Sequence, residues 1–274
     1  MEIIRECSPG LIVLVALGLI AIMTPYISVQ DPVKASLSEP EQTPSLAHPF
    51  GTDYLGRDVL ARVLYGTRVS MMVGICAAAL SVGLGMLIGM TAGYYGKMVD
   101  GILMRLVDTI NSTPSTILLM VLATIFPRNI GSIILAIALT QWLSTARLVR
   151  SETLSVKQRP FIESAVSLGA KDSYILWKHI LPNLLYIAVV SVTLMTAHSI
   201  LTESSLSFLG LGIPPHQASL GNMLNEAQRD IMRGIWWTSL FPGLMISIIM
   251  LCINLLGEDI KTRLAPNREM RTEL

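Results

Sequence analysis

Charged residues are scarce in this chain of 274 residues, where Asp, Glu, Lys and Arg together make up only 14%. Soluble globular domains contain about a quarter charged residues. Hydrophobic residues make up 52% of the chain, and the formal net charge of +1 gives no sign of nucleic-acid binding. The composition therefore predicts an integral membrane protein, in which each apolar helix satisfies its own backbone hydrogen bonds.

The sequence also lacks the motifs of common catalytic and metal sites. Its three cysteines, Cys7, Cys76 and Cys252, lie far apart and form no C-x-x-C pair, which favours buried thiols over a metal or redox site. The phosphate-binding pattern G-x-x-x-x-G-K-[ST] is absent, as are G-x-S-x-G and H-E-x-x-H. We therefore predict no catalytic residue, no metal ligand and no cofactor bound by this chain.

Apolar stretches long enough to cross a bilayer follow one another along the chain. They lie at about 10–29, 69–94, 101–126, 130–149, 183–209 and 236–256. No small-residue cleavage pattern follows the first stretch, so we expect it to be retained as a helix. The sequence thus predicts an all-α integral membrane bundle of six transmembrane helices.

Lysine and arginine residues are distributed unevenly between the segments that separate these stretches. Most of them fall on the cytoplasmic side if both termini are cytoplasmic, which is the bias that the positive-inside rule describes. The basic segment 150–182 is then cytoplasmic, and the proline-containing segment 30–67 is extracytoplasmic. In the latter we expect an ordered cap with local polar contacts of Asp53, Arg57 or Asp58.

Small residues recur at every fourth position of the second stretch, on one helical face: Ala77, Ser81, Gly85, Gly89 and Gly93. Such a ridge allows another helix to approach closely in lipid. The partner is either a helix of the same chain or a helix of another subunit.

Ionisable residues within apolar spans are costly and often functional. Arg105 and Asp108 lie three residues apart on one helical face, and we favour a structural ion pair between them over a gate. His198 and Glu203, in the fifth stretch, are weak candidates for the substrate pathway. For Glu203 a polar packing role is the alternative.

The basic segment contains a short amphipathic helix. Pro160 suits its first turn, Phe161, Ala165 and Leu168 can share a face, and Gly169 is placed to end it. A helix of this length is not stable alone in water. It must rest on its own bundle, on a partner or on the membrane surface.

This segment resembles the "EAA" loop of the membrane subunits of bacterial binding-protein-dependent ABC importers. The matching residues are Glu163, Ala165, Gly169, Ile180, Leu181 and Pro182, while Ser164 stands where a second alanine is usual. In that family the loop forms a coupling helix that docks in a cleft of the ATPase subunit. The resemblance thus implies ATPase-coupling roles for Phe161, Glu163, Ser164, Ala165, Leu168 and Gly169.

Two further runs are similar to the dipeptide, oligopeptide and nickel group of these permeases, and to its "C" type subunit. Residues 48–58 read H-P-F-G-T-D-Y-L-G-R-D, and residues 203–212 read E-S-S-L-S-F-L-G-L-G. Arg105, Asp108 and Pro114 also match the group's third-helix pattern. Together with the coupling segment, the resemblance covers roughly residues 10–266.

The resemblance implies a type I ABC importer permease in the bacterial cytoplasmic (inner) membrane. It divides the chain into an N-terminal region with the first helix and extracytoplasmic segment (1–68), a permease core (69–266) and a cytoplasmic tail (267–274). Expected partners are a homologous "B" type permease, two cytoplasmic ATPase subunits that bind ATP and Mg, and an extracytoplasmic solute-binding protein. The implied role is a non-catalytic channel subunit for short peptides or nickel chelates. An ion-coupled secondary transporter subunit, and a membrane enzyme or structural subunit, are the alternatives.

Overall fold

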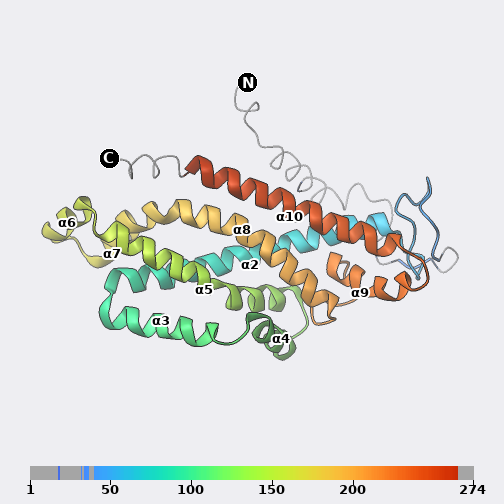
Figure 1. Ribbon diagram of the computed structural model, residues 1–274, viewed down its shortest axis with the longest axis horizontal. Helices are drawn as coiled ribbons and strands as arrows, with labels where there is room; N and C mark the ends of the chain where they lie inside the picture. Colours follow the sequence, from blue (N-terminus) through green and yellow to red (C-terminus); the bar gives the residue numbers. More distant parts are fainter. Residues whose placement is uncertain (1–17, 19–31, 33, 37–39, 265–274) are drawn as a thin grey trace, which may run out of the picture. The chain divides into compact units, whose positions relative to one another are not determined.

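The computed structural model describes residues 40–264 without a gap, together with residues 18, 32 and 34–36. Helices dominate the described part, which contains no strand beyond an isolated bridge between Thr52 and Asp58. Figure 1 labels the helices α2 to α10 in chain order, and η1 is a π-helix between α7 and α8. The bounds are α2 Val59–Tyr95, α3 Lys97–Asn111, α4 Ser115–Ile125, α5 Ile130–Lys157, α6 Pro160–Ser167, α7 Asp172–Tyr174, η1 Ile175–Ile180, α8 Leu181–Phe208, α9 Leu220–Ile231 and α10 Trp237–Leu264.

Four stretches of helix in the described part are long and apolar enough to cross a membrane: Val59–Tyr95, Ile130–Lys157, Asp172–Phe208 and Trp237–Arg263. A bent pair, α3 and α4, brings the total to five if it forms one span. These helices confirm an all-α membrane fold. Apart from residue 18, the first predicted span, 10–29, lies outside the described residues, so the total of six remains a prediction.

Helix α2 begins ten residues earlier than the hydropathy pattern suggested, at Val59. Asp58 precedes it, and the Asp58 Oδ2 accepts a hydrogen bond from the backbone N–H of Ala61 at 2.7 Å. The other carboxylate oxygen of Asp58 lies 3.0 Å from Nδ1 of His48. A side-chain acceptor at this position satisfies one of the free N–H groups of the first turn, so the helix can start before the apolar run does.

The predicted third span is divided in the structure. Helices α3 and α4 are separated by three residues and bent by 86°. Pro114 explains the break, because it lacks an N–H for the helical ladder and disfavours helical geometry at Thr113. The chain restarts as α4 when the N–H groups of Ile117 and Leu118 both bond to the carbonyl of Pro114.

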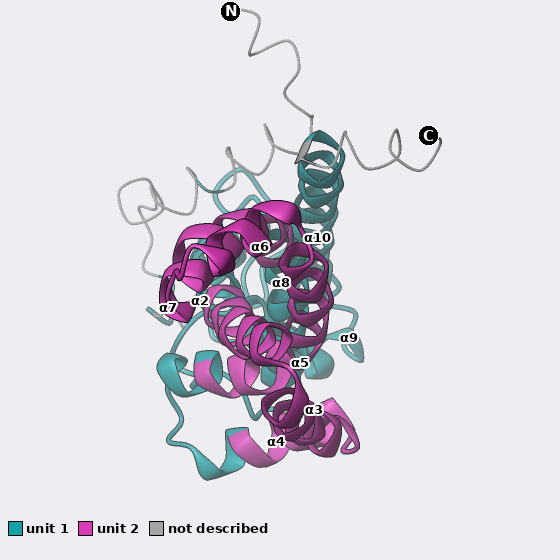
Figure 2. Cartoon of the chain, turned by 90° about the vertical axis from the view of Figure 1, so that its left-hand side faces the viewer, with its two compact units in different colours: residues 1–76, 123–134, 193–274 teal, residues 77–122, 135–192 magenta. Residues whose placement is uncertain are grey.

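The described chain separates into two compact units, coloured in Figure 2, and the divisions fall within α2, α4, α5 and α8. In the unit of residues 77–122 and 135–192, the small-residue ridge packs against α5. A Cβ added to Gly85 would lie 2.6 Å from the Cβ of Thr145, and one added to Gly93 would lie 2.7 Å from the Cβ of Thr153. The ridge therefore serves packing within the chain, one of the two alternatives left open by the sequence.

In the other unit, buried side chains from the beginning of α2, the end of α8, α9 and α10 form one core. Its members are Val59, Val63, Ala197, Ile200, Leu220, Met223, Ile235, Trp237, Ile246, Ile249 and Ile253. The segment before α2 joins this core through the stacked rings of Phe50 and Phe241, whose centroids are 3.9 Å apart. Trp237 also donates from Nε1 to the carbonyl of Thr52 at 3.0 Å. Residues 40–58, here called the cap, are thus fixed to the helices below them.

The close approach of α2 and α5 generates a prediction. A Cβ at position 89 would lie 2.4 Å from the carbonyl oxygen of Ala146, so even Gly89→Ala forces the two backbones apart. Such overpacking typically costs about 1–3 kcal/mol. The control is Gly83→Ala on the same helix, where nothing lies within 4 Å of an added Cβ.

We expect Gly89→Ala to lower the thermal stability of the purified protein and Gly83→Ala to leave it unchanged or raise it, since alanine favours helix over glycine by up to about 1 kcal/mol. Thermal unfolding in detergent measures both. Equal melting temperatures for the two variants would contradict the packing described.

Candidate functional site

The predicted coupling helix is present as α6. Pro160 occupies its first turn, and the chain ends the helix in a Schellman motif at Leu168 and Gly169. The N–H of Gly169 bonds to the carbonyl of Val166 at 2.9 Å, and the N–H of Ala170 bonds to that of Ala165 at 3.1 Å. Gly169 has φ +79°, a conformation that residues with a β-carbon adopt at a cost. The sequence therefore predicted both ends of α6 correctly.

One side chain of α6 is buried and most of the others are exposed. Ile162 is buried, whereas Phe161, Glu163 and Ser164 are exposed, and Ala165 is half-buried. Leu168, at the end of the helix, has 88% of its surface exposed. The predicted face of Phe161, Ala165 and Leu168 therefore presents apolar groups outward, as a docking surface requires.

The helix rests on the segment that follows it. The ring of Phe161 lies 6.1 Å from that of His179, and the ring of Tyr174 meets His179 edge-on at 5.4 Å. The hydroxyl of Tyr94, at the end of α2, donates to Oδ1 of Asp172 at 2.8 Å. Lys157 in turn donates from Nζ to the carbonyl of Tyr94 at 2.6 Å. These contacts connect the α6–α7 segment to the ends of α2 and α5.

A π-helix, η1, joins α7 to α8. Pro182 follows it and lacks the N–H that would bond to the carbonyl of Lys178, so the regular ladder cannot continue through this point. Asn183 donates from Nδ2 to the neighbouring carbonyl of His179 at 2.7 Å. No sequence pattern identified η1, although Pro182 marked the position.

The two candidates for the substrate pathway lie on different faces of α8. His198 is exposed, whereas Glu203 is fully buried. The carboxylate of Glu203 accepts hydrogen bonds from the hydroxyls of Ser70 at 2.8 Å and Ser207 at 2.7 Å. The structure thus gives Glu203 the polar packing contacts that the sequence left as an alternative. Among the described residues, no three His, Cys, Asp or Glu side chains are arranged to hold a metal ion.

The prediction of an ion pair between Arg105 and Asp108 within α3 was wrong. Asp108 accepts a hydrogen bond from Nη2 of Arg147, on α5, at 2.8 Å. Both side chains are largely exposed, at 68% for Asp108 and 46% for Arg147. Local spacing suggested Arg105 as the partner, but an arginine from a neighbouring helix reaches the carboxylate instead.

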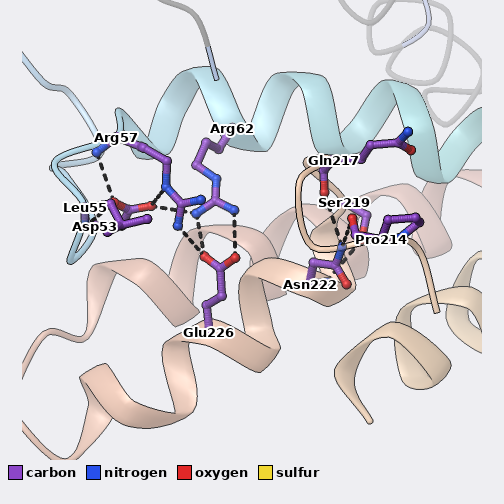
Figure 3. Close-up of polar contacts among 9 residues, drawn as sticks. All are labelled: Asp53, Leu55, Arg57, Arg62, Pro214, Gln217, Ser219, Asn222 and Glu226. Carbon is purple, nitrogen blue, oxygen red and sulfur yellow. Dashed lines mark hydrogen bonds and ion pairs between the residues drawn. The ribbon is translucent and has the colours of Figure 1, made fainter. Parts of the chain in front are cut away.

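A buried charge network fixes the cap to α2 and α9 (Figure 3). Asp53 accepts at Oδ2 from Nε of Arg57 and from Nη1 of Arg62, both at 2.6 Å. Glu226 accepts from Nη2 of Arg57 at 2.6 Å and from both terminal nitrogens of Arg62, at 2.7 and 3.2 Å. The predicted local contact between Asp53 and Arg57 is confirmed. Glu226, from α9, was missed because no motif connects it to the cap.

Two further residues of α9, Asn222 and Asp230, are polar and buried. Asn222 donates from Nδ2 to the carbonyls of Pro214 at 3.3 Å and Gln217 at 3.2 Å (Figure 3). It also donates to the carbonyl of Ile213 at 3.0 Å, and these bonds fix the loop before α9. Burial raises the pKa of Asp230 above its ordinary value, and this shift is opposed by a hydrogen bond from Thr238. The nearby Asp53 carboxylate raises the pKa of Asp230 further.

The chain is similar in sequence to known membrane components of transport systems. Residues 85–269 match the family described as binding-protein-dependent transport system inner membrane component. The chain is 38% identical over 257 residues to the dipeptide transport system permease protein DppC of Bacillus subtilis (strain 168), which covers 94% of this chain and 80% of that protein. It is 36% identical over 257 residues to the oligopeptide transport system permease protein OppC of the same organism. The matched region covers 94% of this chain and 84% of that protein. A putative peptide transport system permease protein of Brucella abortus biovar 1 (strain 9-941) is 38% identical over 266 residues, with 97% and 89% covered.

The charge network around Glu226 generates a second prediction. Only 3% of the Arg62 side chain and 19% of the Glu226 side chain are exposed. Glu226→Ala therefore removes the carboxylate that accepts hydrogen bonds from both terminal nitrogens of the buried Arg62 guanidinium. Breaking one side of a buried ion pair costs about 3–5 kcal/mol. The control is Glu41→Ala, which removes the more exposed ion pair between Glu41 and Arg233 and should cost about 1 kcal/mol or less.

Thermal unfolding of the purified protein, combined with trypsin cleavage within the cap, measures both effects. We expect Glu226→Ala to melt at a lower temperature and to expose Arg57 to trypsin, and Glu41→Ala to behave like the wild type. If the two variants lost the same stability, the network would not be what fixes the cap.

Proposed function

Because the chain belongs to the family of binding-protein-dependent transport system inner membrane components, we propose that it is one of two channel-forming subunits of an ATP-driven importer of short peptides. The names of its relatives, a dipeptide and an oligopeptide permease, favour peptides over nickel chelates as the cargo. A homologous "B" type permease completes the channel. Two ATPase subunits bind ATP and Mg, and a solute-binding protein delivers the peptide.

The observation that carries this proposal is the exposed apolar face of α6. This helix has eight residues, and it is too short to be stable without support. The protein supports it through the buried side chain of Ile162 and through the contact between the rings of Phe161 and His179, and it leaves Leu168 and part of the Phe161 side chain exposed. An apolar face held in place on a rigid support suits docking into a cleft of another protein.

The charge distribution favours one orientation in the membrane. We place the basic segment that contains α6 in the cytoplasm, where the ATPase subunits are, together with both termini. The cap is then extracytoplasmic. Its fixed arrangement on α9 suits repeated contact with a soluble binding protein, because little ordering is needed at each encounter.

Transport requires that movement of α6 reach the membrane helices. Asp172 and Lys157 both contact Tyr94, so a displacement of the α6–α7 segment acts on the end of α2. Closure of the ATPase subunits can then favour one of two channel states, inward-open or outward-open, provided that these states are close in free energy.

Gly169 tests this proposal. No atom lies within 4 Å of a Cβ added there, so Gly169→Val produces no clash within the chain, but it strains a backbone with φ +79° by about 1–3 kcal/mol. We expect the end of α6 to rearrange and ATP hydrolysis to become uncoupled from uptake. The matched control is Gly234→Val, which has φ +80°, an equally open environment and the same strain at the end of α9.

Peptide uptake and binding-protein-stimulated ATPase activity are measured for both variants in proteoliposomes that contain the whole complex. Gly234→Val should retain the wild-type ratio of peptide imported to ATP hydrolysed, and Gly169→Val should lower it. Wild-type values of both activities in Gly169→Val would show that α6 is not the coupling element. An equal loss in both variants would indicate a general effect of strain.

A further inference from the structure

A polar bend lies between the amphipathic helix α3 and the apolar helix α4. Residues 111–116, here called the elbow, read N-S-T-P-S-T and connect α3 to α4. All six are exposed in the isolated chain. The residues that follow on α4 are apolar, as a lipid-embedded helix requires. Hydroxyl and amide groups therefore gather where the backbone leaves the helix.

The backbone of the elbow has the same need for polar partners as its side chains. Several backbone groups are paired here: the carbonyls of Asp108 and Ile110 accept from the N–H groups of Ser112 and Thr113, and the Pro114 carbonyl accepts from the first turn of α4. The N–H groups of Ser115 and Thr116, at the start of α4, have no partner within their helix. Lipid provides none, so non-helical backbone at membrane depth occurs only where it is buried in protein or lines a water-filled cavity. Exposure of the elbow in this chain leaves an aqueous cavity or a neighbouring subunit as its surroundings.

The adjoining face of α3 is charged. Arg105, Asp108 and Ser112 follow one another at helical spacing, and Asp108 pairs with Arg147 of α5. This ion pair is mostly exposed. It already balances its own charges, so it needs no charged partner from another subunit, and lipid would disfavour it strongly. Water therefore suits this face of α3 better than lipid or a charged partner from another subunit does.

We propose that the elbow and this charged face of α3 line the aqueous route and contact the passing peptide. The proposal rests on the function proposed above. Hydroxyl and amide groups both donate and accept hydrogen bonds, so they can exchange partners with the N–H and C=O groups of any peptide main chain. The guanidinium of Arg105, which is exposed on this face, can bind the terminal carboxylate of the peptide. A route lined in this way admits peptides of different side chains.

Cysteine accessibility in the assembled complex tests the proposal. In a background with Cys7, Cys76 and Cys252 replaced by alanine, Ser115→Cys is a nearly isosteric change at the elbow, and Thr113→Cys is a second elbow site. The control is Leu87→Cys, on an exposed apolar face of α2. A positively charged, membrane-impermeant methanethiosulfonate reagent is applied to proteoliposomes.

We expect both elbow cysteines to react at least about tenfold faster than Leu87→Cys, because the reactive thiolate forms in water and not in hydrocarbon. Peptide-loaded binding protein with ATP should slow the reaction several-fold, and solute-free binding protein should not. Elbow cysteines that react no faster than the control would place the elbow against lipid or the partner permease. Fast reaction without protection by peptide would place it in water away from the route.

Either of those results would overturn the inference. Failure of the proposed function is recognised separately, since the cysteine-free complex would then import no peptide before any cysteine is introduced.

Discussion

Lipid offers no hydrogen-bond partners and no hydrophobic drive for helices to associate, and this constraint accounts for much of the protein's construction. Helices α2 and α5 associate through close backbone approach at Gly85, Gly89 and Gly93. Glu203 is buried only because serine hydroxyls surround its carboxylate. At the elbow, where the chain departs from helical geometry, the exposed residues are polar, and their hydrogen-bonding groups need water or protein as a partner. The same physical rule thus explains both packing and the proposed route.

The extramembrane parts are built differently, by fixing short segments with specific polar contacts. Helix α2 has 37 residues and is about 55 Å long, far more than the roughly 30 Å of the hydrocarbon core, so at least one of its ends extends beyond that core. Its first turns bear Arg62, which fixes the cap through Asp53 and Glu226. Its last turn bears Tyr94, which contacts Asp172 beside α6. One helix therefore contacts both segments that we propose to meet soluble partners.

Sequence reasoning succeeded where the determinants are local. Pro160 and Gly169 fixed the ends of α6, and Asp53 and Arg57 are four residues apart. It failed where partners are remote: Glu226 is 164 residues from Arg62, and Arg147 is 39 residues from Asp108. Pro114 was visible inside the third apolar stretch, but hydropathy alone reads α3 and α4 as continuous. The bend depends on backbone geometry that an average over a window cannot report.

Docking of the exposed face of α6 on the ATPase subunits predicts a specific change in the affinity between these subunits and the membrane complex. Burying a leucine side chain is worth about 1.5–3 kcal/mol, so Leu168→Ser should weaken ATPase binding roughly tenfold or more. Leu46→Ser alters a leucine of the cap that is likewise fully exposed and should leave the affinity unchanged. Equal affinities for wild type and Leu168→Ser, measured on complexes in lipid nanodiscs, would contradict the account.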